Sequence, residues 1–386
     1  MELFEFLNLR GTDLPSIVTS VETTVGLHRD DVLLAVGSIV EGLGNRKSDV
    51  DVLLITSRDA SSLPARDELG LVAGRCLVDL RILRTGWVDE AVGRLRIWSQ
   101  APWEVSHPGT FTLDERALLH RLLHGRLLNE AGEDRVAARM PSRTALARLK
   151  LQVARQMGRT IQVDMVGYRE SGDYRSLVFA AQELLGHAVD ALTAGYELTN
   201  PVPKWRHRML DRIPSSWEDP LVLRPTTLTA SQQFWRLHRA PELPEERSAL
   251  AHAFRITTFA RAVFAWAEGR LVKCSFAPQV RPPWPALARQ AHDTMLPYLD
   301  FDVDFALGAD RVTLARLNEF GETVEISPRE FSVTLLCDGM TTARESEAFL
   351  QGSGHDVPAS PVTSQLLSRL ETAKLVIPAL RAYNVR

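Results

Sequence analysis

Two aspartates at alternate positions, preceded by a glycine and a serine, are the residues of this chain best suited to chemistry. Gly37 and Ser38 end the apolar run VLLAVGS, and Asp49 and Asp51 open the apolar run DVDVLLIT. Because strand side chains alternate between faces, both aspartates point the same way, and the apolar residues that alternate with them point into the core. Two carboxylates on one strand edge, opposite a glycine turn, can hold a divalent cation against a phosphate chain.

The chemistry of Mg²⁺ explains this combination of residues. Mg²⁺ takes oxygen ligands and is usually shared between carboxylates and substrate phosphates. Gly37 lets the backbone approach an anion closely, and Ser38 offers a hydroxyl and an N–H at the start of an expected helix. Asp-x-Asp and Gly-Ser are each common in caps and loops, so the prediction depends on their order and spacing together.

A third carboxylate lies on the next expected strand. The run RCLVDLRIL is rich in strand-forming residues, is bounded by Gly74 and Gly86, and carries Asp79 at its centre. An unpaired charge is costly in the middle of a buried strand. If this strand neighbours the first, Asp79 can share metal ions with Asp49 and Asp51. Two bridged metals could activate an attacking hydroxyl and stabilise a leaving pyrophosphate.

These residues give the sequence a resemblance to the DNA polymerase β-like nucleotidyltransferase superfamily. The stretch GSIVEGLGNRKSDVDVLLI is most similar to the minimal and antibiotic nucleotidyltransferases. The resemblance implies that Gly37 and Ser38 bind nucleotide phosphates, and that Asp49, Asp51 and Asp79 bind Mg²⁺ and carry the catalysis. It covers about a third of the chain, roughly residues 15–130.

A length of 386 residues predicts several domains. We expect an α+β fold in which residues 1–135 form a nucleotidyltransferase domain, with strands near 31–36, 50–56 and 75–83 in a mixed sheet with flanking helices. Residues 140–280 have helical periodicity and resemble the helical partner domain that closes the cleft of small-molecule nucleotidyltransferases. The Pro-rich stretch around 282 separates them from a third domain at 286–386.

The third domain resembles a winged helix, most closely the PqqD-like peptide-recognition domains. Its expected order is helix, Asp-Gly turn, helix, helix, strand. The residues that carry the resemblance are Leu335, Leu336, Asp338, Gly339, Thr342, Leu367, Leu370 and Leu375. The expected recognition helix at 362–374 offers only Arg369 and Lys374 as cations, which argues against DNA. Peptide docking at a strand edge is the functional alternative to a plain packing or dimerisation domain.

Two further clusters could contribute to a site. Lys204, Arg206 and Arg208 follow Pro203 and could reach a triphosphate, with Lys204 the best candidate because a Pro-Lys-Trp turn would hold it; the alternative is a solvated loop. His120 and His124 are four residues apart on an expected helix and could share a metal. Because the glutamate of HExxH is missing, we predict that they are helix-surface histidines.

Composition limits the remaining possibilities. The net charge of −3 argues against a protein whose main task is to bind long nucleic acid. Cys76, Cys274 and Cys337 are far apart and form no CxxC pair, which is typical of a reducing compartment. Without a signal-peptide pattern or an apolar run of membrane-spanning length, we expect a cytoplasmic location and no membrane partner.

The sequence thus predicts a Mg²⁺-dependent nucleotidyltransferase. It would move a nucleoside monophosphate, AMP from ATP, to a small-molecule or peptide acceptor and release pyrophosphate, in natural-product biosynthesis. One alternative is a catalytically weak nucleotide-binding regulator or antitoxin-like protein. The other is an antibiotic-resistance adenylyltransferase. The sequence leaves the acceptor, the choice of nucleotide and the oligomeric state open.

Overall fold

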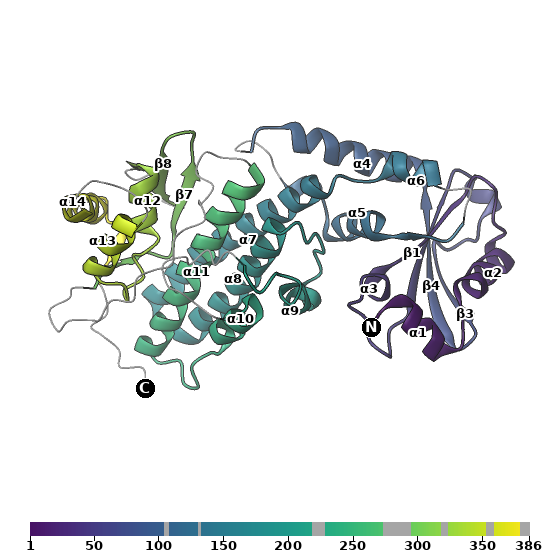
Figure 1. Cartoon of the computed structure of the whole chain (residues 1–386), viewed down its shortest axis with the longest axis horizontal. Helices are drawn as coiled ribbons and strands as arrows, with labels where there is room; N and C mark the ends of the chain where they lie inside the picture. Colours follow the sequence, from purple (N-terminus) through teal and green to yellow (C-terminus); the bar gives the residue numbers. More distant parts are fainter. Residues whose placement is uncertain are drawn as a thin grey trace. The chain divides into compact units, whose positions relative to one another are not determined.

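The chain forms two compact units (Figure 1). The computed structural model describes residues 1–103, 108–129, 133–217, 228–272, 295–317, 323–352 and 359–378. Unit 1 consists of Met1–Leu149 and Thr199–Arg208, and unit 2 consists of Lys150–Leu198 and Met209–Arg386. The α+β class with a mixed sheet and flanking helices is confirmed.

Unit 1 is built on a five-stranded mixed sheet with strand order β3-β4-β2-β1-β5. The β2–β4 pair is parallel and the other pairs are antiparallel. A two-residue turn at Gly74 and Arg75 joins β3 to β4, because Ala73 pairs with Cys76. The strands are β1 (Val32–Val36), β2 (Val50–Thr56), β3 (Glu68–Ala73), β4 (Cys76–Arg84) and β5 (Arg126–Leu127).

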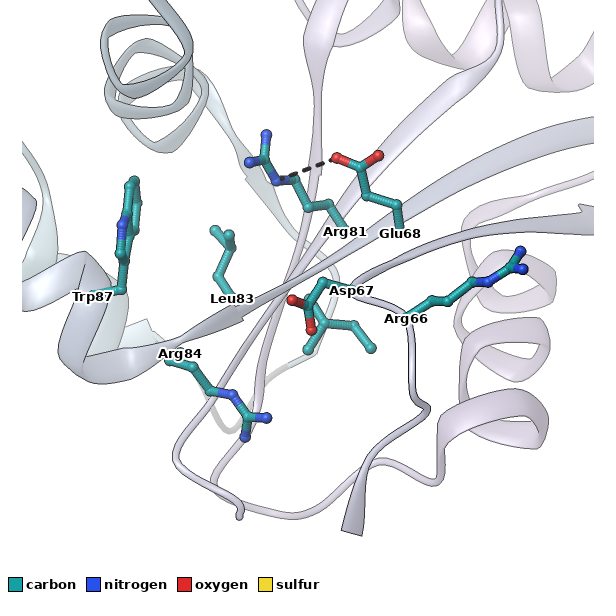
Figure 2. A pocket seen from close by; sticks show the side chains of 8 residues that line it. Arg66, Asp67, Glu68, Arg81, Leu83, Arg84 and Trp87 are labelled. Atoms are coloured by element: carbon teal, nitrogen blue, oxygen red, sulfur yellow. Dashed lines mark ion pairs between the residues drawn. The ribbon is translucent and has the colours of Figure 1, made fainter. Parts of the chain in front are cut away.

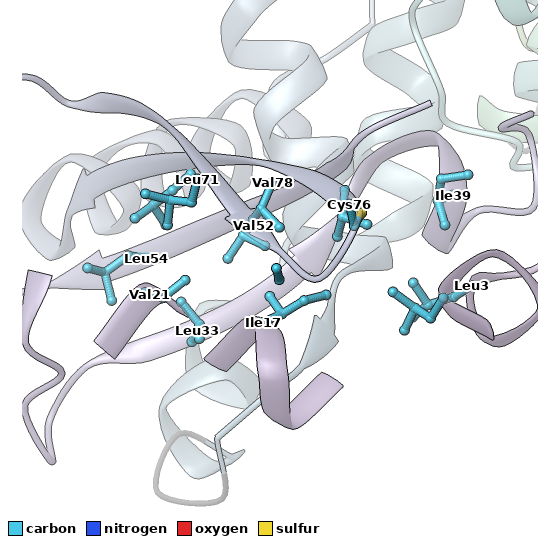
Figure 3. Packing of buried hydrophobic residues seen from close by; sticks show 14 of the residues in the cluster. Leu3, Ile17, Val21, Leu33, Ile39, Val52, Leu54, Leu71, Cys76 and Val78 are labelled. Carbon is cyan, nitrogen blue, oxygen red and sulfur yellow. The ribbon is translucent and has the colours of Figure 1, made fainter. Parts of the chain in front are cut away.

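One face of this sheet packs against α1 (Leu3–Arg10) and α2 (Leu14–Val25), as Figure 3 shows. The Asp13 carboxylate caps α2 by accepting from the Ser16 N–H at 2.8 Å, and Pro15 lies in the first turn. Alternate residues of each strand enter this core, and the residues between them therefore point to the opposite face. The core residues of β2 and β4 are Val50, Val52, Leu54, Cys76, Val78, Leu80 and Ile82.

The opposite face carries the polar residues of β2 and β4. The helix α4 (Thr85–Gln100) contacts β2 and β4, and α5 (Leu113–His124) contacts β1. A capping box between Thr112 and Glu115 starts α5. Unit 1 also contains the single turn α3 (Gly37–Val40) and α6 (Glu133–Arg139), and α9 (Arg206–Leu210) begins at its end. Exposed Val72 and Leu77 show that these helices leave part of the face open.

Unit 2 combines long helices with the C-terminal strands and helices. Its helices α8 (Tyr174–Gly195) and α11 (Glu246–Val272) pack against each other, and α10 (Ala230–His238) contacts both. The helix α7 (Arg143–Ser171) belongs to unit 2 from Lys150 onward. The Phe254 ring on α11 stacks on Tyr298 and on Phe301, with 4.2 Å between centroids in each pair.

The C-terminal part of unit 2 has the predicted order of helices followed by a strand. An antiparallel sheet of order β7-β8-β9 precedes three helices, and β10 pairs with β6. The elements are β6 (Tyr298–Leu299), β7 (Val303–Leu307), β8 (Val312–Arg316), β9 (Val324–Ile326), α12 (Pro328–Thr334), α13 (Ala343–Gly352), α14 (Ala359–Thr372) and β10 (Val376–Ile377). The Pro-rich boundary at 281–285 and Cys274 lie outside the described residues.

A buried charge network joins the long helices of unit 2 to its C-terminal strands. Arg261 on α11 donates to the carbonyls of Asp300 at 2.7 Å and Val303 at 3.2 Å. Arg155 on α7 forms an ion pair with Glu268 on α11. Other ion pairs join Arg169 to Asp300 and Arg316 to Asp300 and Asp302. Unit 2 therefore has a shared interior on both sides of the predicted boundary at 280–286.

In the described part of the chain, no helix combines the length and the apolar character that crossing a bilayer requires.

Candidate active site

The register of the unit 1 sheet brings the predicted site residues into one row. Val36, the residue before Gly37, pairs with Asp51, and Asp51 pairs with Asp79 on the parallel strand β4. Neighbouring strands lie about 4.8 Å apart. Gly37, Asp51 and Asp79 therefore come together from three separate elements, on the face opposite the α1–α2 core.

Gly37 is required at this point by the backbone and by Asp51. Its φ of +81° is unfavourable for residues with a side chain, and an added Cβ would lie 2.8 Å from the Asp51 Cγ and closer still to Oδ2. The turn into α3 therefore runs directly against the Asp51 carboxylate. Because α3 is a single turn, the helix dipole that we expected beside Ser38 is weak. The half-buried Ser38 still offers its hydroxyl and amide at this turn.

The three carboxylates influence one another. Burial raises the pKa of Asp51, and the charges of Asp49 and Asp79 add to this shift. Partial loss of hydration, followed by a hydrogen bond and the charge of Asp49, raises the pKa of Asp79. Asp79 itself is exposed, so the expectation that burial demands a partner for it is wrong: the sheet face is open there.

Two cations oppose this crowding of negative charge. Arg121 on α5 places Nη2 3.3 Å from Asp51 Oδ1. Lys204 lies in the short 3₁₀ turn Pro203–Trp205, where its Nζ is 5.0 Å from the Trp205 ring centroid. The charges of Arg121 and Lys204 both lower the pKa of Asp51. Lys204 is thus in unit 1 with the aspartates, although it is remote from all three of them in sequence.

A buried polar network holds the Thr199–Arg208 segment that carries Lys204. The His120 Nε2 lies 2.9 Å from Glu41, and these two side chains are 3% and 5% exposed. The His120 Nδ1 is 2.8 Å from the Thr199 hydroxyl, and the Asn200 amide donates to both Glu41 oxygens at 3.1 and 3.2 Å. Burial would raise the pKa of Glu41, but His120 and Asn200 hold it below its usual range. The prediction that His120 lies on the helix surface is wrong.

Glu41, His120 and Arg121 are site-related residues that the sequence interpretation missed. His120 and Arg121 are adjacent on α5, and Glu41 follows α3 directly. The only signal was the pair His120 and His124, whose ring centroids lie 4.6 Å apart. Both rings approach Thr199, which lies more than 70 residues away in sequence.

A cavity of about 310 Å³ opens over Asp51 and Asp79. We call it the acidic cleft. It is lined by Asp51 and Asp79 together with Glu68, Arg81 and Arg121. Among the residues that the structure describes, no three Asp, Glu, His or Cys side chains converge closely enough to hold a metal by themselves. Oxygen ligands nevertheless suit Mg²⁺, which commonly takes only one or two carboxylates and completes its shell with phosphates and water.

Comparison with known proteins finds distant similarity among solved structures. No protein-family model matches the sequence, and no curated protein matches it either. Among solved structures, a nucleotidyltransferase-like protein from Exiguobacterium sibiricum 255-15 is similar, with a TM-score of 0.37 and 14% identity over 67% of this chain and 78% of that chain. At this TM-score, the function has to be inferred from the residues of this chain alone.

Proposed function

We propose that this protein is a nucleotidyltransferase that moves AMP from ATP to an acceptor oxygen and releases pyrophosphate. The observation that carries the proposal is the row formed by Gly37, Asp51 and Asp79, with the charge of Asp49 acting on both of these aspartates. Crowded carboxylates beside a glycine turn favour a cation and a close-lying phosphate chain. The cations Arg121 and Lys204 at the same site are suited to a polyanionic substrate.

Each residue of the site has a role in this proposal. Asp49 and Asp51 would hold Mg²⁺, and Asp79 would act as the base for the acceptor. The bound metal would neutralise phosphate charge and favour departure of pyrophosphate. Gly37 and Ser38 would hold phosphate oxygens through backbone N–H groups and the Ser38 hydroxyl. Lys204 would balance the charge of the triphosphate.

In the transfer step, one bond to the α-phosphorus of ATP forms and another breaks. The acceptor oxygen forms a bond to the α-phosphorus of ATP. The bond from that phosphorus to the oxygen that bridges the β-phosphate breaks, and pyrophosphate leaves. The proton of the acceptor passes to Asp79, the most exposed of the three carboxylates. Catalysis comes from positioning and charge neutralisation, without a covalent enzyme intermediate.

The C-terminal part of unit 2 would recruit the acceptor if that acceptor is a peptide. A three-stranded sheet followed by three helices supports the PqqD-like interpretation, and the edge strand β9 is the element to which a peptide strand could add. Arg369 on α14 already donates to the Glu325 carbonyl of β9. Such a peptide would therefore have to share or displace that contact. Natural-product biosynthesis, where peptides and small acids are both substrates, is the setting that we propose.

Calorimetry with Mg·ATP tests the nucleotide site. The double variant Asp49→Asn/Asp51→Asn should bind Mg·ATP at least about 100-fold more weakly than the wild type, a loss of about 2.8 kcal/mol. Because the substitutions remove crowded charges, the variant should stay folded. The control Asp59→Asn changes an exposed aspartate away from the cleft and should bind normally. Unchanged affinity in the double variant would contradict the site assignment.

Asp79→Asn tests the chemical role separately. Its affinity for Mg·ATP should change by less than about fivefold, a difference of about 1 kcal/mol. Pyrophosphate release should fall by at least about 100-fold, because the acceptor proton loses its base. Turnover within about threefold of the wild type would make Asp79 a structural residue. Mg·ATP binding without any pyrophosphate release by the wild type would favour the alternative of a nucleotide-binding regulator.

A further inference from the structure

The two oxygens of the Asp51 carboxylate face different neighbours. Oδ2 lies toward Gly37, since it is the atom nearest to a Cβ added there, and Oδ1 accepts from Arg121 Nη2 at 3.3 Å. Arg121 also lines the acidic cleft. A cation that binds Asp51 through Oδ1 would therefore have to share this oxygen with the guanidinium or displace it.

Arg121 acts electrostatically on more than one carboxylate of the site. Burial raises the pKa values of Asp51 and Asp79, and the charge of Arg121 lowers both of them. In the free protein, this guanidinium therefore supplies part of the positive charge that the crowded carboxylates favour. It does so in direct contact with Asp51, one of the two proposed metal ligands.

Another arginine of the acidic cleft has a partner of its own. Arg81 Nε lies 3.7 Å from Glu68 Oε1, as the dashed line in Figure 2 shows, and the two residues are opposite each other on β4 and β3. A metal ion at Asp51 would leave that ion pair intact. Of these two arginines, Arg121 is therefore the one whose contact competes with a metal ion.

The contact between Arg121 and Asp51 is easily exchanged. A separation of 3.3 Å is long for an N–H···O hydrogen bond, and the two side chains are 34% and 23% exposed. Ion pairs that water can reach contribute little to stability. A guanidinium carries its N–H donors in a planar fork that also matches the oxygens of a phosphate. Arg121 can thus change partners at a small cost in free energy.

Such an exchange needs no movement of the helix that carries Arg121. The preceding residue on α5, His120, is 3% exposed and has buried polar partners, which anchor this part of the helix. The Gly37 turn lies against the same Asp51 carboxylate that Arg121 contacts. Phosphate oxygens held at that turn would therefore be within reach of the long Arg121 side chain through rotation about its own bonds.

We propose that Arg121 exchanges partners during nucleotide binding: it neutralises Asp51 in the free protein and donates to the phosphates of Mg·ATP in the complex. This inference rests on the proposed function, because the new partner is the nucleotide of that site. The consequence is a site that opposes a metal ion arriving alone and favours a metal ion that arrives with a nucleotide. Arg121 thus couples binding of the metal to binding of the triphosphate.

The charges predict effects of opposite sign for Arg121→Gln. The variant lacks a positive charge beside Asp51, so a free divalent cation should bind more tightly. Mg·ATP carries a net negative charge and would lose the donors of Arg121, so it should bind more weakly. Gln and Arg have similar helix propensities, and Arg121 is only half-buried, so the variant should fold. A merely structural role would not move the two affinities in opposite directions.

Two binding measurements on the full-length protein test this prediction. Mn²⁺ is the probe for metal alone, because it suits the same oxygen ligands as Mg²⁺ and its free concentration can be measured by electron paramagnetic resonance. Arg121→Gln should bind Mn²⁺ at least about threefold more tightly than the wild type. In calorimetry, the same variant should bind Mg·ATP at least about tenfold more weakly.

Two further variants separate charge from structure. Arg121→Lys keeps a positive charge beside Asp51, so its affinity for Mn²⁺ should stay within about twofold of the wild type. Its affinity for Mg·ATP should lie between those of the wild type and Arg121→Gln, because an ammonium group lacks the planar fork. Arg116→Gln makes the same change on the same helix, away from the lining of the acidic cleft, and should change neither affinity.

The outcomes separate this inference from the nucleotide site. Unchanged or weaker Mn²⁺ binding in Arg121→Gln would overturn the exchange, because Arg121 would not compete with a metal ion. Unchanged or tighter Mg·ATP binding would also overturn it, because Arg121 would not donate to the phosphates. Either result would leave the proposed function in place as long as the wild type binds Mg·ATP. A wild type that fails to bind Mg·ATP would contradict the proposed function and the exchange together.

Discussion

Asp51 combines low exposure with two acidic neighbours. Burial, Asp49 and Asp79 all raise its pKa, while Arg121 and Lys204 lower it. A cation between these carboxylates would relieve repulsion that the folded chain otherwise has to tolerate. The charges of Arg121 on α5 and Lys204 in the Pro203–Trp205 turn partly offset the same repulsion.

Gly37→Ala tests the contact between the turn and Asp51. The new Cβ would displace the Asp51 carboxylate, so we expect Mg·ATP affinity to fall at least about tenfold, about 1.4 kcal/mol. Gly26→Ala is the matched control, because Gly26 also has a positive φ, +59°, and no atom within 4 Å of an added Cβ. Both variants should be destabilised by about 1–2 kcal/mol through backbone strain. Calorimetry that finds equal nucleotide affinity in the two variants would show that Asp51 is not in the binding site.

His252 makes the stability of unit 2 depend on pH. Burial, and then the charges of Arg255 and His238, lower its pKa to about 4. The Gln182 side-chain amide lies 2.7 Å from His252 Nε2. This nitrogen can accept the amide hydrogen bond only while the imidazole is neutral. Between pH 6.5 and pH 4, the unfolded chain therefore binds more protons than the folded chain at this site, and stability falls as the pH falls.

We expect this group to lower the free energy of unfolding by about 2 kcal/mol between pH 7 and pH 5. Urea unfolding at both values measures the effect. His252→Gln keeps an acceptor for Gln182 without a titrating group. Between pH 7 and pH 5, the variant should therefore lose about 2 kcal/mol less unfolding free energy than the wild type. The same pH dependence in both proteins would contradict the assignment.

The elements of unit 1 meet at the site through the strand register and through a segment remote in sequence. The sheet alone places Gly37 against Asp51 and Asp79. Lys204 depends instead on the network of Glu41, His120 and Asn200, which joins the end of α3, α5 and the Thr199–Arg208 segment.

A double-mutant cycle tests whether Glu41 acts through Lys204. Lys204→Gln should weaken Mg·ATP binding about three- to tenfold, or about 0.7–1.4 kcal/mol. Glu41→Gln removes the buried charge that holds His120 and Asn200, and should have a similar effect by loosening the segment. If so, Lys204→Gln should add little in the Glu41→Gln background. Additive losses would mean that Glu41 does not position Lys204.

The secondary-structure elements that could be predicted are those whose pattern lies within one short stretch of sequence. The strands near 31–36, 50–56 and 75–83 were predictable from apolar runs, and the structure has β1, β2 and β4 there. We missed β3, an edge strand whose side chains are half exposed and which lacks a continuous apolar run. The short helix α1 was also missed, because its apolar residues show little helical periodicity.

The site divides in the same way. Gly37, Ser38, Asp49 and Asp51 lie within 15 residues and form a pattern that can be read locally. The burial of His120 depends on Glu41 and Thr199. Glu41 precedes it by 79 residues, and Thr199 follows it by 79 residues. The periodicity of apolar residues cannot predict contacts between side chains so far apart in sequence.

Unit 2 is held together by charges inside its interior as well as by apolar packing. Arg261 is 4% exposed, and burial lowers its pKa to about 10. The carbonyls of Asp300 and Val303 accept from it. The C-terminal strands are thus fixed to α11 by hydrogen bonds that an apolar side chain cannot replace.

Arg261→Met should lower the free energy of unfolding by about 3 kcal/mol, because it removes a donor to two buried carbonyls and a buried positive charge among acidic side chains. Arg255→Met is the control on the same helix, since Arg255 is exposed. Urea unfolding should separate the two variants. Mg·ATP affinity should be unchanged in both, because the proposed site lies wholly in unit 1. A stable Arg261→Met variant would show that the buried charge network is dispensable.

The proposed site would hold a metal-bound triphosphate between the Gly37–Ser38 turn and the Asp49–Asp51 pair. A crystal structure of the full chain with Mg²⁺ and a non-hydrolysable ATP analogue would reveal this arrangement. We predict electron density for a metal ion bound by Asp49 and Asp51, with a phosphate oxygen within hydrogen-bond distance of the Ser38 amide or hydroxyl. A nucleotide bound elsewhere, or an acidic cleft that holds neither metal nor phosphate at saturating concentrations, would contradict the claim.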